Sequence, residues 1–217
     1  GEDYQKYPRP FAADQKIAQD NRVDILFAPT VKEMYKTKPL TKVEVTELSS
    51  KLCGYYRPGH FAGVATVVAK LFNIVLPAKA YFGEKDWQQL QIIKQMTKEL
   101  NFPVKIAGLP TVREKDGLAV SSRNKYLNSQ ERKAATVLYK ALKMGAELIK
   151  SGEKNCAAIK KQLINYIASE PLVKLQYLTI CQPQSLNELK RVGKQNLIAV
   201  AAYVGSARLI DNILVKL

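Results

Sequence analysis

A strand, a glycine turn and a helix follow one another in the stretch Lys79-Ala80-Tyr81-Phe82-Gly83-Glu84-Lys85-Asp86-Trp87-Gln88-Gln89. Gly83 allows the backbone to turn sharply after the strand. The helix that follows presents free backbone amides and a positive end to an anion. Lys85 adds a mobile positive charge that suits phosphate. The stretch therefore predicts a phosphate-binding turn in an α/β domain.

The same turn carries two further polar residues, Asp86 and Gln89. They lie three residues apart on the first helical turn, so both can hydrogen-bond a sugar or a carboxylate-bearing substrate from one face. The alternative is that Asp86 is simply an acidic residue that stabilises the positive end of the helix. The residues alone leave both interpretations open.

A second segment of similar character is Lys115-Asp116-Gly117-Leu118-Ala119-Val120-Ser121-Ser122-Arg123-Asn124. Two adjacent hydroxyls and a guanidinium, preceded by glycine, form a flexible clamp for phosphate. Arg123 can meet two phosphate oxygens in bidentate fashion. A turn capped by the serines and Asn124 would have a similar sequence. The segment therefore indicates a phosphate site without requiring one.

Strands and helices alternate in the first half of the chain. Apolar spacing predicts helices over 61–75 and 87–100 and short strands over 23–27, 79–83 and 104–108. Such an alternation is typical of a parallel sheet. Ligands of these sheets bind at the carboxyl ends of the strands, where Gly83 and Lys85 are expected.

The second half of the chain differs in character. We expect one long helix from Ser129, its N-cap, to the stop at Ser151-Gly152, then a helix over 156–167 and strands over 175–180 and 197–204. These elements predict a small α+β unit. The expected domains are residues 1–112 and 113–217. The loop Ser121-Ser122-Arg123, called the serine loop below, should face the strand ends of the first domain across a cleft. Domain interfaces are favoured ligand sites.

Composition limits the partners. The formal net charge is +15, but the lysines are scattered at helical spacing, which is typical of a solvated face. This favours a lysine-rich surface with a local anion pocket over a nucleic-acid-binding module. No apolar stretch reaches the roughly 20 residues that span a bilayer, and the start is polar, so we expect a soluble, cytoplasmic protein without a membrane partner.

The cysteines give a further constraint. Cys53, Cys156 and Cys181 are odd in number and lie far apart. Their spacing indicates neither a disulfide framework nor a zinc site. We therefore expect three reduced thiols and no metal site made by the protein.

Four motifs together resemble the pantothenate synthetases, the pantoate–beta-alanine ligases. The resemblance spans essentially all 217 residues and keeps the order of the motifs. The motifs are Arg57-Pro58-Gly59-His60-Phe61-x-Gly63-Val64, Phe82-Gly83-Glu84-Lys85-Asp86-x-Gln88-Gln89, Asp116-Gly117-Leu118-Ala119-x-Ser121-Ser122-Arg123-Asn124 and Arg208-Leu209-Ile210-Asp211-Asn212.

The resemblance implies an α/β fold with a Rossmann-like nucleotidyltransferase (HUP) parallel sheet, followed by a small α+β C-terminal domain. It also implies an adenylate-forming ligase that uses ATP and Mg²⁺. Pantoate and ATP would give pantoyl adenylate and pyrophosphate, and beta-alanine would then give pantothenate and AMP. Family members are usually dimers, so a homodimer is implied for the complete protein.

The resemblance also implies roles for individual residues. The catalytic and phosphate-binding residues would be Lys85, Ser121, Ser122 and Arg123. Cations on a leaving pyrophosphate stabilise charge as it develops. Gly83 and Asp86 would meet the ribose, Val112 and Val120 would border the adenine, and Gln89 would bind pantoate.

Arg57, His60 and Tyr7 are further substrate-binding candidates that the resemblance places beside the active site. His60 is the only histidine of the chain, and one histidine without a partner makes neither a triad nor a metal site. A positioning role for His60 is therefore preferred to proton transfer. Tyr7 would lie near the beta-alanine end of the cleft, or it is an ordinary surface tyrosine before Pro8.

The sequence departs from the family at its start. It lacks the Pro-Thr-Met-Gly segment and the His-x-Gly-His signature that grips ATP phosphates, so the sheet is expected to be N-terminally incomplete with an open edge. The chain is then a fragment completed by another chain, a truncated product or a sequence without its start. Three functions stay open: the ligase, a non-catalytic fragment that binds nucleotide weakly, and a basic nucleic-acid-binding module.

Overall fold

The computed structural model describes residues 10–217, in two parts that end and begin at Lys42 and Val43. The first part contains helices α1 (Phe11–Asp20) and α2 (Val31–Met34). Thr30 starts α2 with a capping box: its hydroxyl accepts a hydrogen bond from the Glu33 amide, and the Glu33 carboxylate accepts one from the Thr30 amide. This reciprocal pair satisfies two amides that the helix leaves without partners.

The strand predicted over 23–27 is wrong. Residues 10–42 contain no strand, and the apolar side chains of this segment are exposed, Ile25 to 83%. A strand needs a neighbour to accept its backbone hydrogen bonds, and the described part of this unit provides none.

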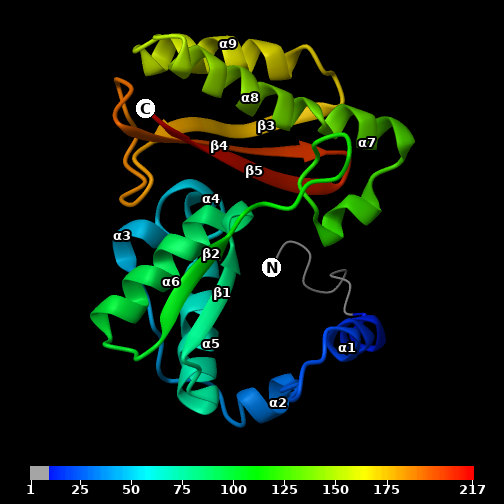
Figure 1. The fold of residues 1–217 in the computed structure, drawn as a ribbon, viewed down its shortest axis with the longest axis vertical. Coiled ribbons are helices and arrows are strands. Elements are labelled where there is room, and N and C mark those ends of the chain that lie inside the picture. The colour runs from blue at the N-terminus through cyan, green and yellow to red at the C-terminus, as the bar shows by residue number, and fades with distance from the viewer. Residues whose placement is uncertain (1–9) are drawn as a thin grey trace. The chain divides into compact units, whose positions relative to one another are not determined.

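The second part contains the strand, turn and helix predicted around Gly83. Strands β1 (Lys79–Gly83) and β2 (Lys105–Leu109) pair in parallel, with Gly83 opposite Leu109 (Figure 1). A 3₁₀ turn, η1 (Glu84–Asp86), and helix α6 (Trp87–Glu99) connect them. The other helices of this layer are α3 (Thr46–Ser49), α4 (Leu52–Tyr56) and α5 (His60–Val75). The predicted helices and strands are confirmed here, with β2 starting one residue later than expected.

A three-stranded antiparallel sheet forms the second layer. Its order is β3 (Val173–Cys181), β4 (Gln195–Val204), β5 (Ala207–Lys216), and β5 is a strand that we did not predict from the sequence. Helices α8 (Val137–Lys150) and α9 (Cys156–Ala168) cover one face of this sheet (Figure 1). The expected fold class, a parallel α/β unit followed by a small α+β unit, is confirmed.

The long helix predicted from Ser129 is broken into two. Helix α7 (Ser129–Ala135) ends at Thr136, where the Thr136 hydroxyl donates to the Lys133 carbonyl oxygen at 2.8 Å and its amide bonds the same carbonyl. Such back-bonding by threonine competes with the regular helical hydrogen bonds. The N-cap is Asn128 rather than Ser129, because the Asn128 side chain accepts from the amides of Gln130 and Glu131.

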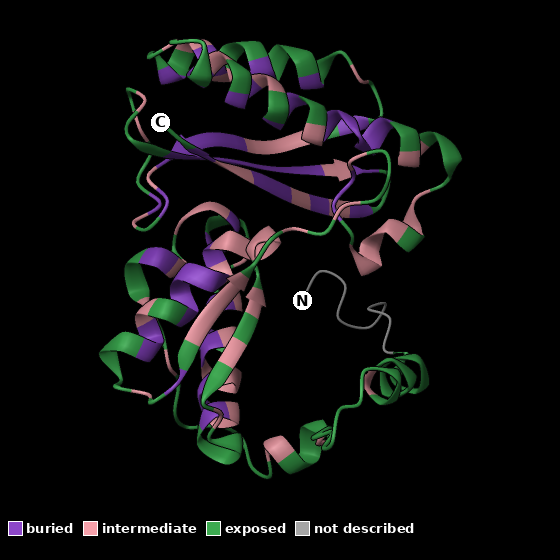
Figure 2. Cartoon of the chain, viewed as in Figure 1, coloured by how far each residue is buried: buried purple, intermediate pink, exposed green. Residues whose placement is uncertain are grey.

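Strand β4 is buried on both of its faces, as the purple ribbon of Figure 2 shows. Ile198, Val200 and Ala202 belong to the apolar cluster under α8 and α9. Leu197 and Ala199 belong to the cluster with α5 and α6. Because successive side chains of a strand point to opposite faces, this one strand joins the two layers of residues 43–217.

The helices and the cysteines bear on what was expected from the composition. Among the described helices, none combines the length and the apolar character needed to cross a bilayer. Cys53, Cys156 and Cys181 are buried and free, which confirms the expected thiols.

Two helical glycines allow a test of this packing. A Cβ at Gly54 would lie 1.8 Å from the backbone oxygen of Ser49, whereas a Cβ at Gly63 would meet nothing within 4 Å. Gly54→Ala should therefore lower the free energy of unfolding by about 1–3 kcal/mol or more, the range of an overpacked core. Gly63→Ala should raise it by about 0.5–1 kcal/mol. Urea unfolding measures both, and equal effects of the two substitutions would contradict the close contact at Gly54.

Candidate active site

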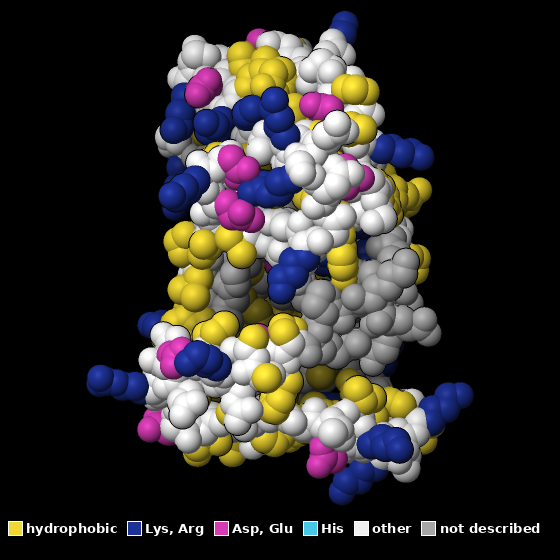
Figure 3. Space-filling model, turned by 90° about the vertical axis from the view of Figure 1, so that its right-hand side faces the viewer, with side chains coloured by type: hydrophobic (Ala, Val, Ile, Leu, Met, Phe, Trp, Pro, Cys, Tyr) yellow, Lys and Arg dark blue, Asp and Glu magenta, His cyan; other side chains and the backbone are white. Residues whose placement is uncertain are grey.

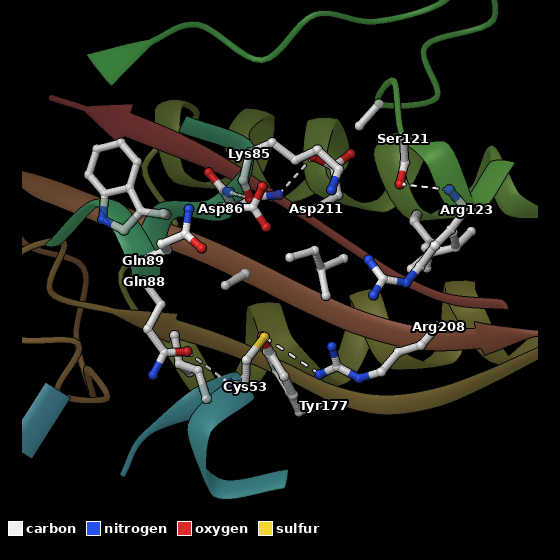
Figure 4. A pocket seen from close by; sticks show the side chains of 18 of the residues that line it. Cys53, Lys85, Asp86, Gln88, Gln89, Ser121, Arg123, Tyr177, Arg208 and Asp211 are labelled. Atoms are coloured by element: carbon white, nitrogen blue, oxygen red, sulfur yellow. Dashed lines mark hydrogen bonds between the residues drawn. The ribbon is translucent and has the colours of Figure 1, made fainter. Parts of the chain in front are cut away.

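A pocket lies between the two layers of residues 43–217, and the phosphate-binding segments predicted from the sequence meet in it (Figure 4). Both faces of the pocket contribute cations and amides, and hydroxyls come from Ser121 and Tyr177. Its polar lining comprises Arg57, His60, Lys85, Asp86, Gln88, Gln89, Ser121, Arg123, Asn124, Arg208, Asp211 and Asn212.

Lys85 and Asp86 enter the pocket from the turn that follows β1. The turn lies at the carboxyl end of the parallel pair, and α6 begins at Trp87 directly after it. Gly83, in contrast, ends β1 and is exposed. It provides the turn, while the side chains that line the pocket come from the next residues. Parallel sheets bind ligands at this edge.

The serine loop reaches the pocket through Ser121, Arg123 and Asn124. Ser121 caps the short 3₁₀ helix η2 (Ser122–Tyr126), because its Oγ accepts a hydrogen bond of 3.3 Å from the Arg123 amide. The Asn124 side-chain amide donates to the Glu114 carboxylate and the Ala119 carbonyl oxygen. The interpretation as a capped turn is therefore correct, and the same turn directs Arg123 into the pocket (Figure 4).

Arg57 and His60 are brought together by a tight turn. The His60 amide donates to the Arg57 carbonyl oxygen at 3.1 Å across Pro58 and Gly59, and Gly59 has φ +77°. Proline followed by a glycine at positive φ is the pattern of a type II turn. The turn places Arg57 Nη1 3.0 Å from His60 Nε2. Since a guanidinium can only donate, Nε2 accepts and the ring proton lies on Nδ1.

The His60 imidazole is neutral near pH 7. Partial burial lowers its pKa to about 4, and the positive charges of Arg57, Arg208 and Arg123 act in the same direction, whereas Asp86 opposes them. With its Nε2 lone pair bonded to Arg57, His60 is arranged to hold that guanidinium rather than to take up a proton. The three guanidinium groups that add to the effect of burial lie around this ring and make its surroundings positive.

Arg208 enters from β5 in Figure 4. Its Nε and Nη2 donate to Gln176 Oε1 at 3.0 and 2.8 Å, and Nη2 lies 3.5 Å from Cys53 Sγ. Cys53 Sγ lies 3.1 Å from the Tyr177 hydroxyl, and burial raises the pKa of Tyr177. This wall of the pocket therefore presents a fixed guanidinium beside a neutral phenol.

The two neighbouring glutamines have different surroundings. Gln88 is buried, and its side chain bonds the Cys53 amide and the carbonyl oxygens of Leu48 and Lys51. These bonds use Gln88 to hold the backbone around α4. Gln89 lines the pocket beside it, which agrees with its choice as a ligand-binding candidate.

Besides Gly83, three of the described residues that were predicted from the sequence do not line the pocket. Val112 and Val120 are exposed to 70% and 49%, and the Val120 amide donates to the Val112 carbonyl oxygen, so the two side chains belong to one paired segment beside the pocket. Ser122 is half-buried at the start of η2 and does not line the pocket. Tyr7 lies outside the described residues.

Sequence reasoning assigned no role to Arg208, Asp211 or Asn212, although the motif containing them was recognised. The available signal was a polar pair inside an apolar strand, because Asp211 and Asn212 interrupt the sequence Ala207–Lys216. Both are buried, and buried polar residues in a strand have partners.

Comparison with known proteins gives the family. The model of the family described as "Pantoate-beta-alanine ligase" matches residues 1–214. The chain belongs to the pantoate-beta-alanine ligase family. This membership confirms the expected ligase, and it does not favour a non-catalytic fragment or a nucleic-acid-binding module. Figure 3 agrees, since Lys and Arg side chains are spread among other residue types on the face it draws.

Several relatives carry the name pantothenate synthetase. The chain is 50% identical over 213 residues to the protein of Thermoanaerobacter sp. (strain X514), covering 98% of this chain and 75% of that one. It is 50% identical over 215 residues to the protein of Caldicellulosiruptor saccharolyticus, covering 99% and 76%.

Solved structures of the ligase family have the same fold. The pantothenate synthetase of Thermus thermophilus superposes with a TM-score of 0.94 at 45% identity, covering 98% of this chain and 77% of that chain. The Francisella tularensis ligase, in complex with beta-gamma ATP and beta-alanine, gives a TM-score of 0.75 at 35% identity, covering 98% and 72%.

The charge state of His60 can be tested directly. A folded pKa of about 4, below the ordinary value of 6.5, means that the unfolded chain binds the proton more readily. The contribution of His60 to stability is then complete above pH 6.5 and is lost as pH falls to about 4. An NMR titration of this single imidazole should show a midpoint near pH 4.

His60→Gln provides the control, since it retains a hydrogen-bond acceptor for Arg57 but does not titrate. The free energy of unfolding of the wild type should fall more than that of the variant between pH 6.5 and 4. A midpoint near pH 6.5 in the folded protein would contradict the burial and the positive surroundings that we assign to the His60 ring.

Proposed function

We propose that this pocket catalyses both steps of the ATP-dependent condensation of pantoate with beta-alanine. In the first step a pantoate carboxylate oxygen attacks the α-phosphorus of ATP, and the bond to the β-phosphate breaks with release of pyrophosphate. In the second step the beta-alanine amine attacks the pantoyl carbonyl carbon, AMP leaves, and the amine proton passes to solvent. The observation that carries this proposal is the convergence of Lys85, Ser121 and Arg123 on one pocket.

The phosphates of ATP are assigned to Lys85 and the serine loop. Lys85 approaches from the turn after β1, and Ser121 and Arg123 approach from the second layer. A triphosphate between them would have cations on two sides. This arrangement stabilises the charge that develops on leaving pyrophosphate. Ser122 precedes Arg123 in the same loop and retains its proposed phosphate contact.

The remaining contacts are assigned by position. Gln89 binds pantoate, and Asp86 with Gly83 meets the ribose. Val112 and Val120 border the adenine, which their exposed, paired position supports. Arg57, held by His60, attracts substrate carboxylate or phosphate. Tyr7 is assigned to the beta-alanine end on the family resemblance.

The pocket suits Mg²⁺ that arrives on ATP. Within the part of the chain that the structure describes, no cluster of three His, Cys, Asp or Glu residues could hold a metal. Asp86 lines the pocket, whereas Arg113 binds the carboxylate of Asp211. Since Asp86 is assigned to the ribose, the ion would be held mainly by the substrate phosphates and by the waters that Mg²⁺ usually keeps. The ion would neutralise part of the phosphate charge.

Removal of Mg²⁺ tests this assignment. Excess EDTA should abolish the exchange of labelled pyrophosphate into ATP, and added Mg²⁺ should restore it. EDTA should leave the melting temperature of the ligand-free protein unchanged, because we expect the metal to bind with ATP. Exchange that persists in EDTA would show that the reaction does not need the ion.

Three further features are proposed. The domain boundary is assigned between Val112 and Arg113; the apolar cluster with α8 and α9 contains only residues after this boundary, whereas the cluster with α5 and α6 also takes in Leu197 and Ala199. The complete protein is a homodimer, and exposed apolar side chains at Val75, Leu76 and Tyr81 offer a surface for it. A cytoplasmic location agrees with the free thiols.

The ligase proposal is tested by pantoate-dependent exchange of labelled pyrophosphate into ATP, with Mg²⁺ and without beta-alanine. The protein should catalyse this exchange, and the Thermoanaerobacter relative serves as the positive control. Absence of exchange, with an active control, would contradict adenylation by this protein.

The role of Lys85 is tested by Lys85→Ala. This variant should lose exchange by roughly 100-fold or more, the cost of removing one group that stabilises transition-state charge. Its melting temperature should stay near that of the wild type, since the Lys85 side chain is half-exposed. Lys105→Ala, which changes an exposed lysine of β2, is the control and should retain activity. Near wild-type exchange in Lys85→Ala would contradict the assigned role.

A further inference from the structure

The turn that carries Lys85 is held from the other layer by a residue of β5. Asn212 Nδ2 lies 3.0 Å from the Glu84 carbonyl oxygen and 2.9 Å from the Lys85 carbonyl oxygen. Both neighbours are acceptors, so the atom facing them must be the amide nitrogen, which donates to each. Asn212 is 8% exposed. Its two bonds are therefore largely shielded from water and fix the backbone of the turn directly at Lys85.

The preceding residue, Asp211, holds the segment that leads to the serine loop. Its carboxylate accepts hydrogen bonds of 2.7 and 2.9 Å from Arg113 Nη1 and Nη2, and the Asp211 side chain is only 4% exposed. Asp211 Oδ1 also accepts from the Asn212 amide at 2.8 Å. Bidentate pairs of this kind fix orientation as well as distance.

Arg113 transmits this constraint toward Ser121 and Arg123. It donates to the Gly117 carbonyl oxygen at 3.1 Å, and its guanidinium stacks 3.7 Å from the centre of the Tyr139 ring. Arg113 forms an antiparallel bridge with Ala119, so residues 113–119 make a hairpin. The hairpin ends at the serine loop, where Asn124 bonds back to Ala119.

We propose that Asp211 and Asn212 form a positioning pair that sets the distance between the two phosphate-binding segments of the pocket. Asn212 holds the Lys85 turn, and Asp211 holds the serine loop through Arg113. Because the two residues are consecutive on one strand, neither segment can shift relative to the other without breaking a buried hydrogen bond. The inference rests on the proposed function, in which both segments bind the same triphosphate.

The pair should matter for one step of the reaction more than for the other. Adenylation requires Lys85 and the serine loop to meet the pyrophosphate that leaves, whereas the attack of beta-alanine on pantoyl adenylate involves no pyrophosphate. A displacement of about 1 Å can reduce a rate by roughly 100-fold when groups must be aligned. A purely structural role for Asn212 would instead reduce both steps together.

The experiment measures the two half-reactions separately in Asn212→Ala, with Asn212→Ser as the second variant if the first fails to fold. Pantoate-dependent pyrophosphate exchange reports adenylation, and pantothenate formation from synthetic pantoyl adenylate and beta-alanine reports the second step. We expect exchange to fall by roughly 100-fold, mainly in kcat, and the second step to change far less.

Asn196→Ala is the matched control. Asn196 is also a buried asparagine with two side-chain bonds to backbone, made to the amide and the carbonyl oxygen of Gly193, but it does not line the pocket. This variant should be less stable without any difference between the two half-reactions.

The outcomes separate the inference from the proposed function. The positioning role alone would be overturned in two cases, provided that the wild type exchanges pyrophosphate. In the first, the Asn212 variants exchange as fast as the wild type. In the second, they lose both half-reactions equally. Failure of the wild type to exchange pyrophosphate would overturn the proposed function and the inference with it.

Discussion

The two-sided burial of β4 is the constraint on which residues 43–217 depend. Its alternating side chains belong to two apolar clusters, one with α8 and α9 and one with α5 and α6. Leu197 and Ala199 also line the pocket. The register of β4 and β5 then sets Ala199 opposite Asn212 and Val200 opposite Asp211. Burial of β4 therefore fixes the apolar part of the pocket lining. Through the strand register, it also fixes where Asp211 and Asn212 lie beside the pocket.

The pocket has a positive charge that pH does not remove. Arginine side chains stay protonated at all relevant pH values, and Arg57, Arg123 and Arg208 all lower the pKa of His60. A histidine in these surroundings stays neutral and can accept the hydrogen bond from Arg57. Like charges gathered in a shared, partly buried pocket repel one another, and a polyanion such as a triphosphate relieves this repulsion.

Local sequence patterns predicted the elements that depend on neighbouring residues. The strand, turn and helix around Gly83 follow from apolar periodicity and one glycine. The capped turn of the serine loop follows from its hydroxyls and asparagine. The strand predicted over 23–27 was wrong because pairing depends on a neighbouring strand. The break at Thr136 depends on one hydrogen bond, which the Thr136 hydroxyl donates to the Lys133 carbonyl oxygen. The contacts of Asp211 with Arg113 and of Asn212 with Lys85 join residues 98 and 127 positions apart, which no local pattern reveals. The proposed residue roles come from the family resemblance, because spacing alone does not assign them.

The side chains proposed to bind phosphate and the residues that hold the backbone beside them differ in burial. Lys85, Ser121 and Arg123 are half-buried, whereas Gln88, Asp211 and Asn212, which hold the neighbouring backbone, are buried. A long charged side chain must reach a ligand that enters from water, so it cannot itself be locked in the core. The backbone from which the side chain extends must then be the preorganised part, since functional side chains work best when the residues around them are rigid. The buried amides and carboxylate between the layers provide that rigidity, so the half-buried cations would need to order only the outer part of their side chains when a nucleotide binds.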